Sequence, residues 1–226
     1  MPGMALARWK DLCIDANDVR GLAPFWGAVL GLNLSYQDGG DAVLRGSTPE
    51  QTVWVNQVPE PRTVKQRVHL DVHARSGVEI EALGATRLSG EGEFPWTVMA
   101  DPEGGELCVF VRDVVPDYRL YEVGVDCVDP GPLARWWAEV LGGRLVDDER
   151  GFSYVDQIPG APFDSIDFAP VPEPKTVKNR IHWDLTAESA QPLIDVGATL
   201  LRARDDDIDW DVLADPEGNE FCVFHR

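Results

Sequence analysis

The sequence has little positive charge and few long apolar runs, and both shortages exclude classes of protein. It contains 20 lysines and arginines against 39 aspartates and glutamates, a formal net charge of −19. Binding to nucleic acid or to an anionic membrane needs a basic surface, so we expect neither as a partner. No apolar run approaches the roughly 18–20 residues of a membrane span, and the first residues lack the apolar core of a signal peptide.

Cysteine is also scarce. The four cysteines of the 226 residues form no Cys-x-x-Cys pair, which argues against a structural zinc site of the usual spacing. We expect a cytoplasmic protein, whose thiols are then reduced. Hydrophobic residues make up 44% of the chain, an ordinary globular composition that can supply a core.

The sequence does contain a long repeat, in which one pattern of residues occurs twice. Segment 96–110, WTVMADPEGGELCVF, returns at 210–224 as WDVLADPEGNEFCVF. Segment 58–71, VPEPRTVKQRVHLD, returns at 171–184 as VPEPKTVKNRIHWD. A repeat of this length is a duplicated domain, because solenoid units have roughly 20–50 residues.

The repeat defines the expected domain organisation. The chain length suits two domains of roughly 100–150 residues. We predict a first domain over 1–113, a second domain over 119–226, and a polar linker at about 112–119 that contains a proline. Each copy reads as a strand, a helix and several strands, followed by the same order again.

The first helix of each copy has clear boundaries in the sequence. Apolar residues recur at helical spacing over 22–30 and again over 133–141. An aspartate upstream of each stripe is a typical N-cap, and a glycine downstream is a typical stop. The residues concerned are Asp18 and Gly31 in the first copy, and Asp129 and Gly142 in the second.

The segment before the second helix of each copy alternates between apolar and polar residues, which predicts a strand with one polar face. The polar residues are Arg67, His69 and Asp71 in the first copy, and Arg180, His182 and Asp184 in the second. Histidine can serve as a base or a metal ligand, arginine can hold a carboxylate, and aspartate can orient the histidine. The face is therefore either the wall of a ligand pocket, or a structural network or solvated strand face. Trp96 and Trp210 recur likewise, and either line that pocket or belong to the core.

Taken together, these motifs resemble the glyoxalase/bleomycin-resistance/dioxygenase superfamily, also called vicinal oxygen chelate, and especially its glyoxalase-like domain subgroup. The resemblance covers nearly the whole chain, twice. It implies an α+β fold in which two βαβββ modules form a cupped mixed sheet, a half-open barrel. Four modules would occupy roughly 8–58, 66–112, 119–170 and 179–226. The sequence leaves open whether modules pair within a half or between halves.

The family often holds a divalent metal in the cup, and His69 and His182 match its histidine. Metal-dependent members usually place a glutamate on the final strand, where Cys108 and Cys222 stand here. A set of Asp11, His69 and Cys108 would be chemically able to bind zinc or iron, although it is unusual for the family. In the alternative interpretation the cysteines are small buried apolar residues. We therefore assign no metal or other cofactor from the sequence.

These departures favour a glyoxalase-like protein that binds a small molecule in its cup, as bleomycin-resistance proteins sequester a drug. The alternative is a metal-dependent lyase, isomerase or dioxygenase with a non-standard ligand set. A third interpretation, a degenerate half that only completes the other, is disfavoured because both halves keep the same elements. We expect a small-molecule partner and a monomer or weak homodimer. The predicted ligand-binding residues are Arg67, His69, Asp71, Trp96, Cys108, Arg180, His182, Asp184, Trp210 and Cys222.

Overall fold

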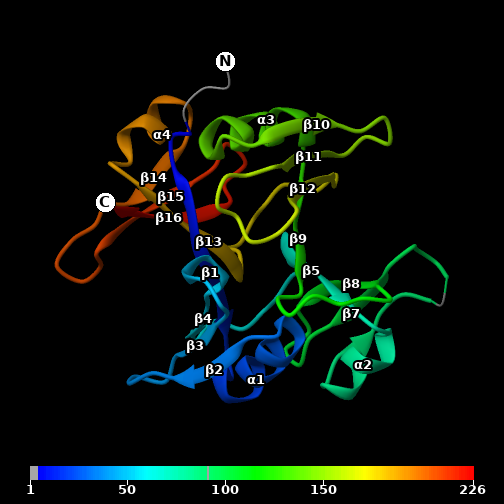
Figure 1. Ribbon diagram of the computed structural model, residues 1–226. Coiled ribbons are helices and arrows are strands. Elements are labelled where there is room, and N and C mark those ends of the chain that lie inside the picture. Colours follow the sequence, from blue (N-terminus) through cyan, green and yellow to red (C-terminus); the bar gives the residue numbers. More distant parts are fainter. Residues whose placement is uncertain (1–4, 91) are drawn as a thin grey trace.

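The computed structural model describes residues 5–90 and 92–226, which form two eight-stranded mixed sheets with few helices (Figure 1). Sheet A takes its strands from the two ends of the chain. They are β1 (Arg8–Ala16), β2 (Asn33–Tyr36), β3 (Ala42–Arg45), β4 (Val53–Gln57), β13 (Ile181–Ala187), β14 (Thr199–Arg202), β15 (Trp210–Ala214) and β16 (Glu220–His225). Their order across the sheet is β14-β15-β16-β13-β1-β4-β3-β2.

Sheet B takes its strands from the middle of the chain. They are β5 (Val68–Ala74), β6 (Thr86–Arg87), β7 (Thr97–Ala100), β8 (Glu106–Val111), β9 (Leu120–Cys127), β10 (Arg144–Asp147), β11 (Ser153–Asp156) and β12 (Ser165–Pro170). Their order is β10-β11-β12-β9-β5-β8-β7-β6. Neither sheet closes into a barrel, so the α+β class with open, cupped sheets is confirmed.

The order of the strands shows which modules share a cup. The first module pairs with the fourth through antiparallel β1 and β13, and the second pairs with the third through antiparallel β5 and β9. In Figure 1 the blue start of the chain and its orange-to-red end therefore lie in one sheet. Each cup is built from both halves of the sequence, which means that neither half contains a whole cup.

Helices cover one face of each sheet. The four α-helices of the described residues are α1 (Val19–Leu30), α2 (Gly77–Ala82), α3 (Pro130–Leu141) and α4 (Gln191–Asp195), with a short 3-10 helix η1 (Pro49–Gln51). Helix α1 packs on β3 and β4, and α3 packs on β11 and β12. None of the helices in the described part of the chain has the length and apolar character needed to cross a bilayer.

The predicted helix boundaries are confirmed. The carboxylate of Asp18 accepts hydrogen bonds from the backbone N–H groups of Arg20 and Gly21, which would otherwise lack partners. Asp129 also occupies the N-cap of α3, although its side chain makes no capping hydrogen bond. Both helices end at a glycine in the left-handed conformation, Gly31 with φ 72° and Gly142 with φ 70°.

The repeated Asp-Pro-Glu-Gly turn joins two modules of the same half. The indole N–H of Trp26, on α1, donates to Asp101 at 3.3 Å, and Trp137 on α3 donates to Asp215 at 3.1 Å. Each aspartate also accepts two backbone N–H groups of its own turn at 2.8–2.9 Å. The turn therefore holds the helix of one sheet against a hairpin of the other, β7–β8 or β15–β16. This structural role accounts for the repetition of both residue types in the sequence.

Candidate functional site

We call the face of sheet A that lies away from its helices cup A. The pairing of β1 with β13 sets Asp11 opposite Asp184 and Cys13 opposite His182. On the other side of β13, Cys222 of β16 lies next to Asp184. A cavity of about 530 Å³ opens over this polar centre, a volume within the range of small-molecule sites.

Aromatic side chains and one lysine complete cup A. Trp54, Trp210 and Phe224 line the cavity, and the last two stack with ring centroids 5.2 Å apart. Lys10 Nζ lies 2.6 Å from Asp11 Oδ2, which also accepts the indole N–H of Trp54 at 3.2 Å. The cavity thus combines an apolar wall with a small number of polar groups, the usual design of a ligand pocket.

Burial controls the protonation of the centre of cup A. Burial, followed by repulsion from Asp11, raises the pKa of Asp184 well above its usual range. Burial lowers the pKa of His182 to about 4. Asp11 Oδ1, Asp184 Oδ1 and His182 Nδ1 are buried and have no hydrogen-bond partner. Because such groups are costly when left unpaired, they are natural attachment points for a ligand or an ion.

Cup B is the corresponding face of sheet B. There the pairing of β5 with β9 sets Asp71 opposite Glu122 and His69 opposite Gly124, and Cys108 of β8 lies next to Asp71. His69 Nε2 lies 3.2 Å from Asp71 Oδ1. The second and fourth modules therefore place the same His–Asp–Cys group in the two cups.

Carboxylates crowd cup B. Burial, followed by repulsion from Asp167 and Asp71, raises the pKa of Glu122 to about 7. Burial and repulsion from Asp71 raise the pKa of Asp167 to about 6. Burial lowers the pKa of His69, but attraction to Asp71 outweighs it and the net pKa is well above 6.5. His69 is therefore the charged histidine and His182 the neutral one.

The residue beside the imidazole differs between the two cups. A Cβ placed on Gly124 would lie 2.3 Å from Cε1 and Nε2 of His69, so the imidazole occupies the space that a side chain would fill. In cup A the side chain of Cys13 stands at that position, and His182 Nε2 lies 3.9 Å from Asp184 Oδ1. The glycine lets the imidazole approach its aspartate, and the cysteine holds it back.

The predicted site residues divide between the cups, with two corrections. His69, Asp71 and Cys108 lie in cup B together with Trp96, which stacks on Phe110 at 5.6 Å. Four of the other predicted site residues line the cup A cavity: His182, Asp184, Trp210 and Cys222.

The arginines are the first correction. Arg67 and Arg180 precede their strands, and their guanidinium groups donate to backbone carbonyl groups of the opposite connecting loop, at Glu173 and Glu60 respectively. They tie the two inter-sheet connections together, so they do not form the cup wall predicted from strict alternation.

The second correction concerns the proposed set of Asp11, His69 and Cys108. Asp11 belongs to sheet A, whereas the other two belong to sheet B, so this set cannot share an ion. Sequence reasoning also missed Lys10, Cys13, Trp54 and Asp167. Their only signal is that each differs in type from its counterpart in the other copy.

Among residues 5–90 and 92–226, two groups of ligand atoms are close enough to hold a metal ion: Cys13–His182–Asp184 and His69–Asp71–Cys108. Within each group the atoms lie within 4.8 Å of one another. Thiolate, imidazole and carboxylate are the donors that zinc prefers, and the unpartnered His182 Nδ1 and Asp184 Oδ1 are available in the first group. The residues of cup A therefore fit a zinc-type ion, although the Lys10 ammonium competes for the same carboxylates.

Comparison with known proteins shows the same duplication. The sequence model of the family described as "Glyoxalase-like domain" matches residues 11–110 and 122–224. Glyoxalase I from Zea mays has a similar structure, with 13% identity, a TM-score of 0.71, and coverage of 97% of this chain and 92% of that chain. A candidate dioxygenase from Bacillus subtilis has 16% identity, a TM-score of 0.64, and coverage of 98% and 86%. Identities this low show a shared fold alone, and the comparison with curated proteins gives no match.

Proposed function

Because the chain belongs to the glyoxalase-like domain family, which covers both of its halves, we propose that it binds a small organic molecule in cup A. The mode of action is sequestration of the kind that bleomycin-resistance proteins perform, and it needs no metal. The observation that carries this proposal is the cavity of about 530 Å³, with its aromatic wall above buried polar groups that lack partners.

The cavity defines the chemistry of its ligand. A flat or apolar part would pack against Trp210 and Phe224, where aromatic stacking stabilises a complex beyond simple burial. Near neutral pH the raised pKa of Asp184 keeps a proton on its carboxyl group, which can donate a hydrogen bond, while neutral His182 can accept one. A planar molecule with a donor and an acceptor on one edge fits these groups.

A metal-dependent lyase, isomerase or dioxygenase is the second candidate, favoured by the group Cys13, His182 and Asp184. When bound, a divalent metal would polarise a carbonyl or enediolate oxygen of the substrate. The chain's own residues would hold the ion, and Lys10 would hold the side chain of Asp11 in place beside it. The cavity walls would exclude water from that centre.

Metal content separates the two functions. We would measure zinc, iron, manganese and nickel by mass spectrometry in protein purified without a chelating column. A near-stoichiometric metal that is lost in His182→Ala and retained in His225→Ala would overturn the metal-independent proposal. His225 is a suitable control because it is bound to Asp211 outside both metal groups.

Ligand binding is tested in the same preparation by a thermal-shift screen of planar heteroaromatic compounds. A compound that binds cup A should stabilise the wild type and the Trp96→Ala variant, but not Trp210→Ala. If no compound distinguishes these variants, the cavity is not the ligand site.

We further propose a cytoplasmic monomer or weak homodimer without a nucleic-acid or membrane partner. Both cups are complete within one chain, so neither needs a second copy. Measurement of molecular size at several protein concentrations tests the oligomeric state.

A further inference from the structure

Cup A contains a cation of its own. The register of β1 against β13 shifts by one residue between Trp9 and Asp11, which makes Lys10 the extra residue of a β-bulge. Bulges redirect a side chain, and here the side chain reaches the cup. Lys10 Nζ lies 2.6 Å from Asp11 Oδ2, 3.9 Å from Asp184 Oδ2, and 4.1 Å from the ring centroid of Phe224. An ammonium thus lies between two acidic side chains and above an aromatic ring.

We call this arrangement of two acidic side chains and one aromatic ring the frame of a cup. Cup B has the same frame without the ammonium. Strand β9 has the corresponding bulge, and its extra residue is Tyr121. The carboxylates of Glu122 and Asp71 stand where Asp11 and Asp184 stand in cup A, and Phe110 corresponds to Phe224. The Tyr121 ring meets Phe110 edge-on at 5.0 Å, so it supplies an aromatic surface but no charge.

A second exchange makes cup B still more acidic. Asp167 of β12 occupies the position that Trp54 has in β4, so the frame of cup B is two formal charges more negative than that of cup A. Asp71 is only 6% exposed, and its Oδ1 accepts no hydrogen bond even though His69 Nε2 is 3.2 Å away. This buried oxygen therefore has His69 as its charged neighbour but receives no hydrogen bond.

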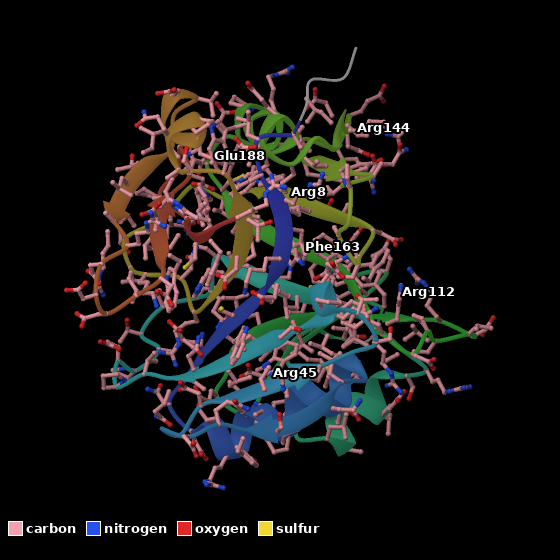
Figure 2. The ribbon with its side chains drawn as sticks, turned by 60° about the vertical axis from the view of Figure 1, so that its left-hand side comes forward. Arg8, Arg45, Arg112, Arg144, Phe163 and Glu188 are labelled. Atoms are coloured by element: carbon pink, nitrogen blue, oxygen red, sulfur yellow. The ribbon has the colours of Figure 1, made fainter. Side chains whose placement is uncertain are left out.

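The arginines near cup B do not pair with its carboxylates. Arg112, labelled in Figure 2, lies over the rings of Phe110 and Tyr121 at 5.6 and 5.4 Å, and Arg150 is paired with Asp148. Among the described residues, neither arginine forms an ion pair with Asp71, Glu122 or Asp167. His69 offsets one of the three carboxylates at most.

An aromatic row borders the same carboxylates. Trp96 stacks on Phe94 at 5.5 Å with an interplanar angle of 9°, and on Phe110 at 5.6 Å. Aromatic faces attract cations and stack on flat apolar groups. Cup B therefore combines negative charge and aromatic surface within one frame, as sites for organic cations do.

We propose that cup B is a second binding site, separate from the cup A cavity, which takes an organic cation: a primary or secondary ammonium attached to an aromatic group. The ammonium lies between Asp71 and Glu122 above Phe110, in the position that Lys10 Nζ has in cup A, and the aromatic group packs against Trp96. Cup A excludes the same ligand because its own lysine fills that position. This site stands whether or not cup A binds the molecule proposed above.

The test is titration calorimetry with 2-phenylethylammonium as the probe and 2-phenylethanol as its neutral analogue. We expect one probe bound per wild-type chain and no detectable binding of the alcohol. Tyr121→Lys installs an ammonium and should weaken binding at least about tenfold, the effect of losing charge-assisted and cation–π contacts. Tyr121→Phe is the matched control and should keep the affinity, while Asp167→Asn should weaken it if Tyr121→Lys does not fold.

Cup A supplies the converse test. Lys10→Met removes the internal ammonium, so this variant should bind a second probe molecule per chain. Absence of probe binding, equal binding of the alcohol, or an unchanged affinity in both Tyr121→Lys and Asp167→Asn would each overturn the proposal. So would binding of zinc alone at cup B without any binding of the probe. Trp210→Ala, which is designed to disable the cup A cavity, should leave the first probe site intact and so distinguishes failure of one cup from failure of the other.

Discussion

Gly124→Ala should lower the pKa of His69, because the glycine provides the space in which the imidazole reaches Asp71. The added Cβ would lie 2.3 Å from two ring atoms, whereas non-bonded carbon atoms rest about 3.5–4.0 Å apart. The backbone of β9 is held in the sheet by pairing on both sides, so the side chain of His69 must move instead.

The size of the effect follows from the ion-pair distance. Suppose that the pair opens from 3.2 Å to the 3.9 Å found between His182 and Asp184. With an effective dielectric constant of about 20, Coulomb's law gives a loss of about 1 kcal/mol, which corresponds to about 0.7 of a pKa unit. Burial then acts on the imidazole with less opposition, as it does on His182, so we expect a decrease of about one unit.

Nuclear magnetic resonance of the imidazole C–H groups is the direct assay, because the chain has only four histidines to resolve. Gly131→Ala is the control, since the nearest atom to its added Cβ is 3.9 Å away. Cys13→Gly in cup A should have the opposite effect and raise the pKa of His182 above about 4. A His69 pKa that stays within 0.3 of a unit in folded Gly124→Ala, a margin well below the expected change of about one unit, would refute the explanation.

The pH dependence of the unfolding free energy is an independent test of the charge on His69. The folded-state pKa of His69 is raised, so its pairing stabilises the native state fully below the unfolded-state pKa of about 6.5, and this contribution is lost as pH rises through the folded-state value. The difference in unfolding free energy between wild type and Gly124→Ala should therefore be largest in mildly acidic solution and decrease at alkaline pH. A difference that grows with pH would contradict the assignment of charge to His69.

Three further predictions concern the turn, the thiols and the lysine. Asp215→Ala should lower the free energy of unfolding in urea by about 3 kcal/mol, because four hydrogen-bond donors lose their acceptor, whereas the exposed Asp113→Ala should change it little. All four cysteines are buried, and burial raises the pKa of Cys127 to about 12, so a thiol reagent at pH 8 should react with none rapidly until denaturant exposes all four. Lys10→Met should raise the pKa of Asp184 further, as measured by carboxyl carbon resonances, since that ammonium lowers it; no change would mean that the lysine does not bridge the carboxylates.

The sequence predicts well whatever depends on neighbouring residues. Asp18 and Gly31 bound a helix because capping and left-handed backbone are local properties, and the repeated turns were recognisable for the same reason. The pairing of modules is different. The connections at 58–67 and 171–180 have nearly the same sequence, and nothing in them specifies which sheet the next strand joins. The unusual ligand set of Asp11 with His69 failed for this reason.

β-Bulges are the second reason why the sequence assigns some side chains to the wrong face of a strand. Strict alternation places Lys10 on the face of Leu12, toward the core, because both are even-numbered positions of one strand. The extra residue in β1 reverses the face at that point and sends the lysine into the cup. The end of a strand is equally hard to locate from the sequence. Strand β5 begins at Val68, one residue after Arg67, so Arg67 lies on the connecting loop and not in the cup.

The differences between the cups are concentrated on one wall of each. The second and fourth modules supply the same His–Asp–Cys group, whereas the first and third supply three unlike pairs: Lys10 and Tyr121, Cys13 and Gly124, and Trp54 and Asp167. Because each sheet pairs one module of each kind, a cup can change its ligand through the variable wall while the shared group stays in place. The combined exchange of Tyr121→Lys, Gly124→Cys and Asp167→Trp should therefore give cup B the properties of cup A. It should lower the pKa of its histidine and abolish binding of 2-phenylethylammonium. If the exchanged protein folds and still binds that cation, the selectivity of cup B resides in the shared wall instead.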